Sequence, residues 1–307
     1  MNNLLVVYNT FGAKDNYGHY FTCIDSILSN GLPEGTKVAI SSVCNSENTR
    51  NALLERYKDK IIFCSMEDRV PVNITFNKAV QECVSKFGEF KYYLYVDSGI
   101  DFLGNDGAIV KAVNAMEDND LGLLSFQVIN DHCLGNVGLT SFLEDGVHLV
   151  PLGSACNGHS ELFSNEIYKT FGSKLIPDVF AAYCTESVYS FIVAAINKRW
   201  GILGGPILNH CKAVDGASSS NKHISQVFGN HWNNLLCSRD ARTFILDPEA
   251  LEAGLGYEEC NKIMLHKADV YENSFPKNAE KLKEMINKYF YLSNSDMDYS
   301  KIICQIN

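Results

Sequence analysis

The sequence predicts an α/β fold, in which helices cover both faces of a mostly parallel sheet and a C-terminal extension follows. Two observations lead to this prediction. In the first half of the chain, short apolar runs alternate with segments whose apolar residues recur at helical spacing, which is the order typical of βαβ units. The run Tyr92–Val96 is also too apolar for a strand with one face in water, which indicates burial from both sides.

The alternating half predicts five strands, at Leu4–Tyr8, Lys37–Val43, Ile61–Cys64, Tyr92–Val96 and Leu121–Ile129. Four helices are expected between them, over Tyr17–Ser29, from a cap at Ser46 or Asn48 through Arg56, over Ile74–Phe87 and over Asp106–Met116. Asn77 lies in the third of these helices. We expect its side chain to brace the turn after Tyr92–Val96 instead of touching a substrate.

The second half of the chain is less regular. It predicts short strands at Val147–Pro151, Ser160–Phe163 and Gly201–Leu208, and helices at Ile167–Phe171, Glu186–Asn197 and Ala279–Tyr289. No repeat and no sharp linker divides the sequence. We therefore expect one domain over residues 1–246 and a helical C-terminal extension over residues 247–307.

Composition narrows the function classes. The chain has 307 residues and a formal net charge of -10, without a run of Lys or Arg, so it lacks the basic face that a nucleic-acid binder needs. No apolar stretch reaches the roughly 20 residues of a transmembrane helix, and the N-terminus lacks the basic region of a signal peptide. Its 11 cysteines form no CxxC pair, which favours reduced, packed thiols in a cytoplasmic protein over disulfides or a zinc site.

Two carboxylates end the most apolar strand. Asp97 follows Val96 directly, and Asp101 comes four residues later. Ligands of open α/β sheets bind at the carboxyl ends of the strands, and a carboxylate there can hold a divalent cation against phosphate oxygens. Each carboxylate can instead cap the helix that follows. The residues alone leave both interpretations open.

Four segments, taken in order, resemble the family 2 glycosyltransferases and their GT-A-fold relatives, which use nucleotide-diphospho-sugars. The similar segments are Leu5–Thr10 with Ser26-Ile27-Leu28, Ser46–Thr49, Val72–Ala79, and Asp97–Asp101 at the place of the family's Asp-x-Asp. The resemblance implies a GT-A-like, Rossmann-type fold. Residues 1–105 would form its nucleotide-binding half and residues 106–246 its acceptor half.

The resemblance also implies a site. Asp97 and His210 would hold Mn²⁺ or Mg²⁺ on the donor diphosphate, with Ser98 and Gly99 beside it. Tyr8, Asn9 and Thr10 would line the nucleoside pocket. The base would be read by Asp68, by its neighbour Glu67 or by backbone groups. Glu186 would be the general base, because an acceptor hydroxyl needs a carboxylate to take its proton, with Asp178 in reserve.

The sequence departs from the family in two places. Gly99 stands where the second carboxylate of Asp-x-Asp is expected, and Ser41-Ser42-Val43 stands where many relatives carry an Asp that reads uracil. For three residues, a structural role stays open beside the functional one. His210 could be a partly buried histidine bonded to backbone. Glu186 could stabilise a helix N-terminus electrostatically, and Asp101 could cap a helix.

The resemblance implies an enzyme that moves a sugar from a UDP-sugar, or alternatively a GDP-sugar, to a glycan or lipid-linked glycan by an inverting, metal-dependent displacement. It would act in the cytoplasm, with peripheral contact to a membrane as an option. Two alternatives stay open: a nucleotidyltransferase that makes the sugar nucleotide, and a non-catalytic glycan-binding protein on a degenerate transferase fold. The oligomeric state is not readable from the sequence.

Overall fold

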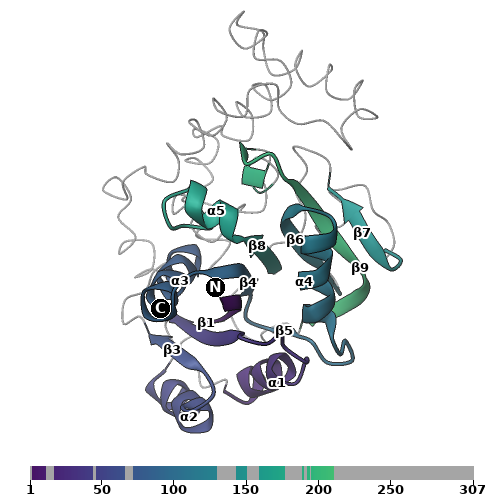
Figure 1. Cartoon of the computed structure of the whole chain (residues 1–307). Coiled ribbons are helices and arrows are strands. Elements are labelled where there is room, and N and C mark those ends of the chain that lie inside the picture. Colours follow the sequence, from purple (N-terminus) through teal and green to yellow (C-terminus); the bar gives the residue numbers. More distant parts are fainter. Residues whose placement is uncertain are drawn as a thin grey trace, which may run out of the picture.

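The computed structural model describes residues 2–11, 17–43, 46–65, 72–129, 143–150, 159–176, 189, 192–193 and 195–210. These residues form one nine-stranded sheet with helices packed against it (Figure 1). Tyr189, Ile192, Val193 and Ala195 are helical, in agreement with the helix expected over Glu186–Asn197. The predicted helix Ala279–Tyr289 and the extension 247–307 lie outside the described residues.

The first half of the chain alternates strands and helices as the sequence predicts. Its elements are β1 (Asn2–Phe11), α1 (Tyr17–Leu28), β2 (Lys37–Val43), α2 (Glu47–Tyr57), β3 (Ile62–Ser65), α3 (Val72–Phe87) and β4 (Phe90–Val96). Ser46 is the N-cap of α2, because its backbone is extended and its hydroxyl accepts a hydrogen bond from the N–H of Thr49 at 3.1 Å.

The remaining elements include one strand that the sequence did not predict. Its elements are β5 (Ile100–Asp101), α4 (Ala108–Asp118), β6 (Leu121–Val128), β7 (Gly146–Leu149), β8 (Ser160–Ser164), α5 (Asn165–Thr170) and β9 (Arg199–His210). The two-residue strand β5 is the addition. Helix α4 begins two residues after the predicted start at Asp106, because Gly107 occupies its N-cap position with φ 74°. None of the described helices is long and apolar enough to cross a membrane.

The strands lie in the order β3-β2-β1-β4-β8-β6-β9-β5, and β7 pairs with β9. Strands β1 to β4 are parallel to one another, and β6 is parallel to β9. Strand β8 runs antiparallel between β4 and β6, and β5 and β7 run antiparallel to β9. The predicted mostly parallel sheet is confirmed, and the antiparallel strands are β5, β7 and β8.

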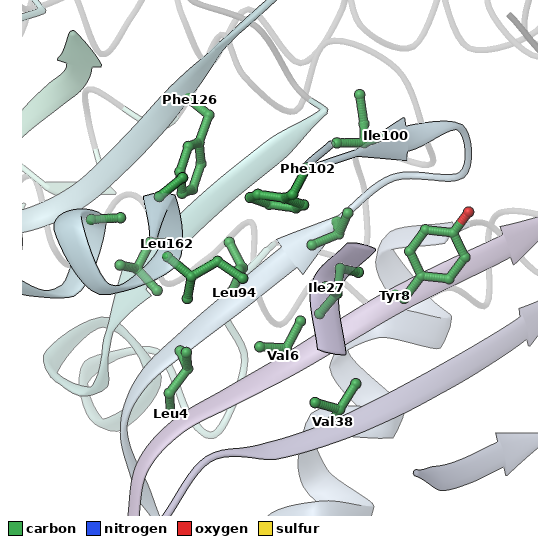
Figure 2. Close-up of a cluster of buried hydrophobic side chains, with 14 of the residues drawn as sticks. Leu4, Val6, Tyr8, Ile27, Val38, Leu94, Ile100, Phe102, Phe126 and Leu162 are labelled. Carbon is green, nitrogen blue, oxygen red and sulfur yellow. The ribbon is translucent and has the colours of Figure 1, made fainter. Parts of the chain in front are cut away.

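Helices cover both faces of this sheet, as predicted. Helices α1, α2 and α4 pack on one face, where Leu4, Val6 and Leu94 form part of a buried cluster (Figure 2). Helices α3 and α5 pack on the opposite face, together with Tyr189, Ile192, Val193, Ala195 and Ile196. Successive side chains of a strand point to opposite faces, so Leu5 and Val7 belong to the second cluster.

Several smaller expectations about packing are also confirmed. Tyr92, Tyr93 and Tyr95 are all at most 6% exposed and pack in the two clusters, so they stabilise the sheet. Cys23, Cys64 and Cys83 are buried, free thiols. Asn77 braces the loop at residues 175–176, a contact that the sequence did not predict. Its amide donates to the carbonyl oxygen of Ile176 at 2.6 Å and accepts from the N–H of Leu175 at 3.0 Å.

Strand β9 is interrupted by a bulge. Its register against β6 jumps from Leu203 to Ile207, so residues 204–206 bulge out of the ladder. A Cβ on Gly204 would lie 1.7 Å from the carbonyl oxygen of Glu144, so only glycine fits there. After the bulge, β9 continues to Asn209 and His210, which pair with β5.

Candidate functional site

Asp97 lies at the carboxyl end of β4, beside the ends of the parallel strands β1 and β2. Its backbone N–H donates to the carbonyl oxygen of His159 at 2.8 Å, and its Oδ1 accepts from the N–H of Ser98 at 2.8 Å. The chain then turns through Gly99 into β5, with the N–H of Ile100 donating to the carbonyl oxygen of Asp97 at 3.3 Å. Asp97 therefore stabilises a turn between two strands, and the alternative that it caps a helix is wrong.

Asp101 holds β5 against the end of β9. Its side chain is 2% exposed, and Oδ1 accepts hydrogen bonds from the N–H of Leu103 at 3.0 Å and from the amide of Asn209 at 2.9 Å. Asp101 does not cap α4, because Gly107 occupies that position. Its structural effect is to fasten the antiparallel pair in which Ile100 faces His210.

His210 thereby reaches the turn that carries Asp97, although the two residues lie far apart in the sequence. The imidazole of His159 connects them. Nδ1 of His159 lies 3.3 Å from Oδ2 of Asp97, and the rings of His159 and His210 are 4.5 Å apart between centroids, with an interplanar angle of 40°. The side chains of His159 and Asp97 are 28% and 30% exposed, so this group of residues is open to a ligand.

Sequence reasoning did not identify His159. It directly precedes β8, whose predicted bounds, Ser160–Phe163, are nearly those observed. The missing information was the position of that strand. Because β8 runs antiparallel to β4 and pairs Ser160 with Val96, the residue before β8 lies next to the residue after β4.

The end of β1 lies next to this turn, and three of its side chains make hydrogen bonds to neighbouring backbone. The hydroxyl of Tyr8 accepts a hydrogen bond from the N–H of Gly99 at 3.3 Å, the amide of Asn9 donates to the carbonyl oxygen of Val96 at 3.1 Å, and the hydroxyl of Thr10 donates to the carbonyl oxygen of Ser41 at 3.2 Å. All three side chains are at most 1% exposed. Burial raises the pKa of Tyr8 well above its usual value, so its hydroxyl stays protonated.

The carboxyl groups of Asp97 and Glu161 both lie close to the hydroxyl of Tyr95. Glu161, two residues after His159, is fully buried and pairs across the sheet with Tyr95. The pKa of Tyr95 is raised well above its usual value, mainly because the side chain is buried and further because the carboxylates of Asp97 and Glu161 are close.

The donor set fits a divalent cation that completes its coordination with substrate. One carboxylate oxygen and imidazole nitrogens suit Mn²⁺ and, for the carboxylate, Mg²⁺. Among the described residues, no three His, Cys, Asp or Glu side chains come together as a full metal-holding group. Such a partial site is the usual arrangement where one or two protein ligands share the ion with phosphate oxygens and water.

Four of the residues predicted from the sequence lie outside the described residues. They are Glu186 and Asp178, the candidates for general base, and Asp68 and Glu67, the candidates for contact with the nucleotide base. Of the other predicted site residues, the structure brings Asp97, Ser98, Gly99 and His210 to one turn, with Tyr8 and Asn9 directly beneath it.

Comparison with known proteins bears on the fold. No family model and no curated protein matches the chain. The chain does match the structure of S. aureus TarS with a TM-score of 0.54 and 12% identity over 94% of its residues, and it spans 55% of that TarS chain. It matches TarS 1–349 in complex with UDP-GlcNAc with a TM-score of 0.53 and 14% identity, covering 96% of this chain and 74% of that one.

A second solved structure from another organism gives the same result. The mannosyltransferase PcManGT from Pyrobaculum calidifontis, in complex with GDP-Man and Mn²⁺, matches with a TM-score of 0.53 and 13% identity, covering 94% of this chain and 87% of that one. At such low identity the likeness concerns the arrangement of helices and strands. The order of the elements, the strand order and these matches together show that the chain has a GT-A-like fold.

Proposed function

We propose that the chain is a glycosyltransferase that moves a sugar from a nucleotide-diphosphate donor to an acceptor hydroxyl. One observation carries the proposal. The pairing of β5 with β9 brings His210 to the turn of Asp97, at the carboxyl ends of the parallel strands, where ligands of open α/β sheets bind. A UDP-sugar is the first donor to test and a GDP-sugar the second, because structures with this fold hold UDP-GlcNAc or GDP-Man.

In this proposal Asp97 and His210 hold Mn²⁺ or Mg²⁺. When bound, the cation would stabilise the negative charge that develops on the departing nucleoside diphosphate. Ser98 and Gly99 contribute backbone groups beside Asp97. The end of β1, from Tyr8 to Thr10, shapes the wall of the nucleoside pocket, and its side-chain hydrogen bonds keep that wall fixed. Asp68 contacts the base.

Glu186 is the proposed general base. Its carboxylate accepts the proton of the acceptor hydroxyl while the hydroxyl oxygen attacks the anomeric carbon, and the bond between that carbon and the diphosphate oxygen breaks. Such a single displacement inverts the anomeric configuration. The acceptor class that we propose is a glycan or a lipid-linked glycan, met in the cytoplasm or at the adjoining membrane surface.

Thermal stability in the presence of ligands tests the proposal directly. A ligand that binds only the folded state raises its stability by mass action. We expect UDP or GDP, and the corresponding nucleotide sugars, to raise the melting temperature more with Mn²⁺ than without it. The same mixtures are then followed for release of free nucleoside diphosphate, which reports hydrolysis or transfer of the donor.

Two variants make the test specific. Asp97→Asn keeps an oxygen that accepts the N–H of Ser98 but removes the negative charge, so it is expected to stay folded and to lose the Mn²⁺-dependent part of the shift. Asp118→Asn, at the exposed end of α4, makes the same change away from the site and should behave as the unmodified chain does. A folded protein that responds to no nucleotide would contradict the proposal and favour a degenerate transferase fold.

A further inference from the structure

His159 contacts both residues that we propose as cation ligands. On the backbone, its carbonyl oxygen accepts the N–H of Asp97 at 2.8 Å. On the side chain, its Nδ1 lies 3.3 Å from Oδ2 of Asp97, and its ring packs at 4.5 Å on that of His210. An ionised carboxylate can only accept, so Nδ1 is the donor in this contact.

The two oxygens of Asp97 are therefore restrained from two sides. Oδ1 accepts from the N–H of Ser98 within the turn, and Oδ2 faces the imidazole of His159. The turn itself offers no second carboxylate, because position 99 is glycine with φ 93°. The imidazole of His159 reaches Oδ2, and the hydroxyl of Tyr95 makes a further side-chain hydrogen bond to the Asp97 carboxylate.

The position of His159 is itself well fixed. It directly precedes β8, whose Ser160 pairs with Val96 and whose next residue, Glu161, pairs with Tyr95. Strand β8 is the centre of the sheet and is buried along its whole length. The imidazole consequently extends from a rigid element, which is what a group that orients another side chain requires.

We infer that His159 is a positioning residue of the cation site, which holds Oδ2 of Asp97 by hydrogen bonding and the ring of His210 by packing. This inference rests on the proposed function. Carboxylate ligands of metal ions are themselves oriented by hydrogen bonds, and the loss of such a partner typically lowers metal affinity by about 10- to 100-fold.

The test measures Mn²⁺ binding in the presence of UDP, and again of GDP, through the relaxation of water protons by protein-bound Mn²⁺. His159→Leu removes the donor and is expected to weaken Mn²⁺ binding by about tenfold or more. His159→Asn places an amide N–H near the position of Nδ1 and is expected to recover most of that loss. His148→Leu, on the separate strand β7, serves as the matched control and should bind as the unmodified chain does.

The outcomes separate this inference from the proposed function. Unmodified protein that binds no Mn²⁺ with either nucleotide would overturn the metal-dependent function and this inference with it. Binding by the unmodified protein that His159→Leu leaves unchanged would overturn this inference alone. Equal loss in His159→Leu and His159→Asn would overturn it as well, because the asparagine retains the donor. Melting temperatures of the metal-free variants confirm that each protein is folded when it is compared.

Discussion

The hydroxyl of Tyr8 accepts a hydrogen bond from the backbone N–H of Gly99, with 3.3 Å between oxygen and nitrogen. This contact joins the end of β1 to the turn that carries Asp97, across 91 positions of sequence. In Figure 2 the ring of Tyr8 lies at the edge of the labelled buried cluster, and its hydroxyl points out of that cluster. The ring of Tyr8 therefore packs in the core, while its hydroxyl oxygen bonds to the turn.

Replacing Tyr8 with Phe should loosen this turn. The substitution keeps the ring but leaves the buried N–H of Gly99 without its acceptor, which costs about 1–3 kcal/mol. We expect a lower free energy of unfolding in urea and weaker binding of UDP with Mn²⁺. Tyr92→Phe, on β4 but without a contact to the turn, is the control and should leave nucleotide binding unchanged. Unaltered binding by Tyr8→Phe would contradict the role given to this hydrogen bond.

Introducing a carboxylate at position 99 should not raise the affinity of the cation site for Mn²⁺. Gly99 has φ 93°, a conformation that residues with a side chain adopt at a cost of about 1–3 kcal/mol. Gly99→Asp is therefore expected to lower the free energy of unfolding without raising Mn²⁺ affinity. Gly99→Ala, which carries the strain but no charge, should lose a similar amount of stability. Tighter Mn²⁺ binding by a fully stable Gly99→Asp would show that the turn accommodates the carboxylate after all.

The bulge in β9 predicts that replacing Gly204 lowers the stability of the fold. A methyl group on Gly204 would collide with the carbonyl oxygen of Glu144 at 1.7 Å, so β7 and β9 could not keep their present distance. We expect Gly204→Ala to cost about 2 kcal/mol or more in a urea titration, since a backbone clash does not relax by a side-chain rotation. Gly18→Ala is the matched control. No atom lies within 4 Å of its new methyl group, and alanine favours α1, so this variant should be neutral or slightly more stable.

Stability should also depend on pH through His19. Burial lowers the pKa of this imidazole from the ordinary value of 6.5, and the nearby carboxylate of Asp101 offsets only part of the effect. The unfolded chain then binds a proton at higher pH than the folded one, so His19 contributes stability above pH 6.5 that is lost as pH falls toward the lowered pKa. Melting temperatures at about pH 7.5 and about pH 5 should differ less in His19→Gln than in the unmodified chain. An equal difference in both proteins would contradict this assignment.

The local parts of this fold could be read from the sequence. Strand β2 has the predicted bounds, Lys37–Val43, and Ser46 caps α2 as expected, because apolar runs and capping side chains act over a few residues. The place of Asp97 at a strand end was predicted for the same reason. These features need no knowledge of which strands are neighbours.

The features that the sequence did not predict depend on contacts between residues that lie far apart in the chain. An apolar pattern at Ser160–Phe163 predicts a strand, but it does not say that the strand runs antiparallel between β4 and β6. Without that neighbour, nothing in the sequence connects His159 to Asp97. Similarly, β5 is only two residues long and exists because Asp101 binds Asn209 from the end of β9. The bracing of the 175–176 loop by Asn77 was missed because its partners lie 98 and 99 positions away.

The group formed by Asp97, His159 and His210 draws one residue from the end of β4, one from the start of β8 and one from the end of β9. Its formation requires that three strands remote in sequence find their neighbours, and such non-local pairings are the slow steps of folding. A fragment that ends after β4, at Val96, would have the parallel strands β1 to β4 but none of the three residues of this group. Nucleotide-dependent Mn²⁺ binding would then report that the second half of the sheet has assembled, so that it could serve as a signal for complete folding during refolding experiments.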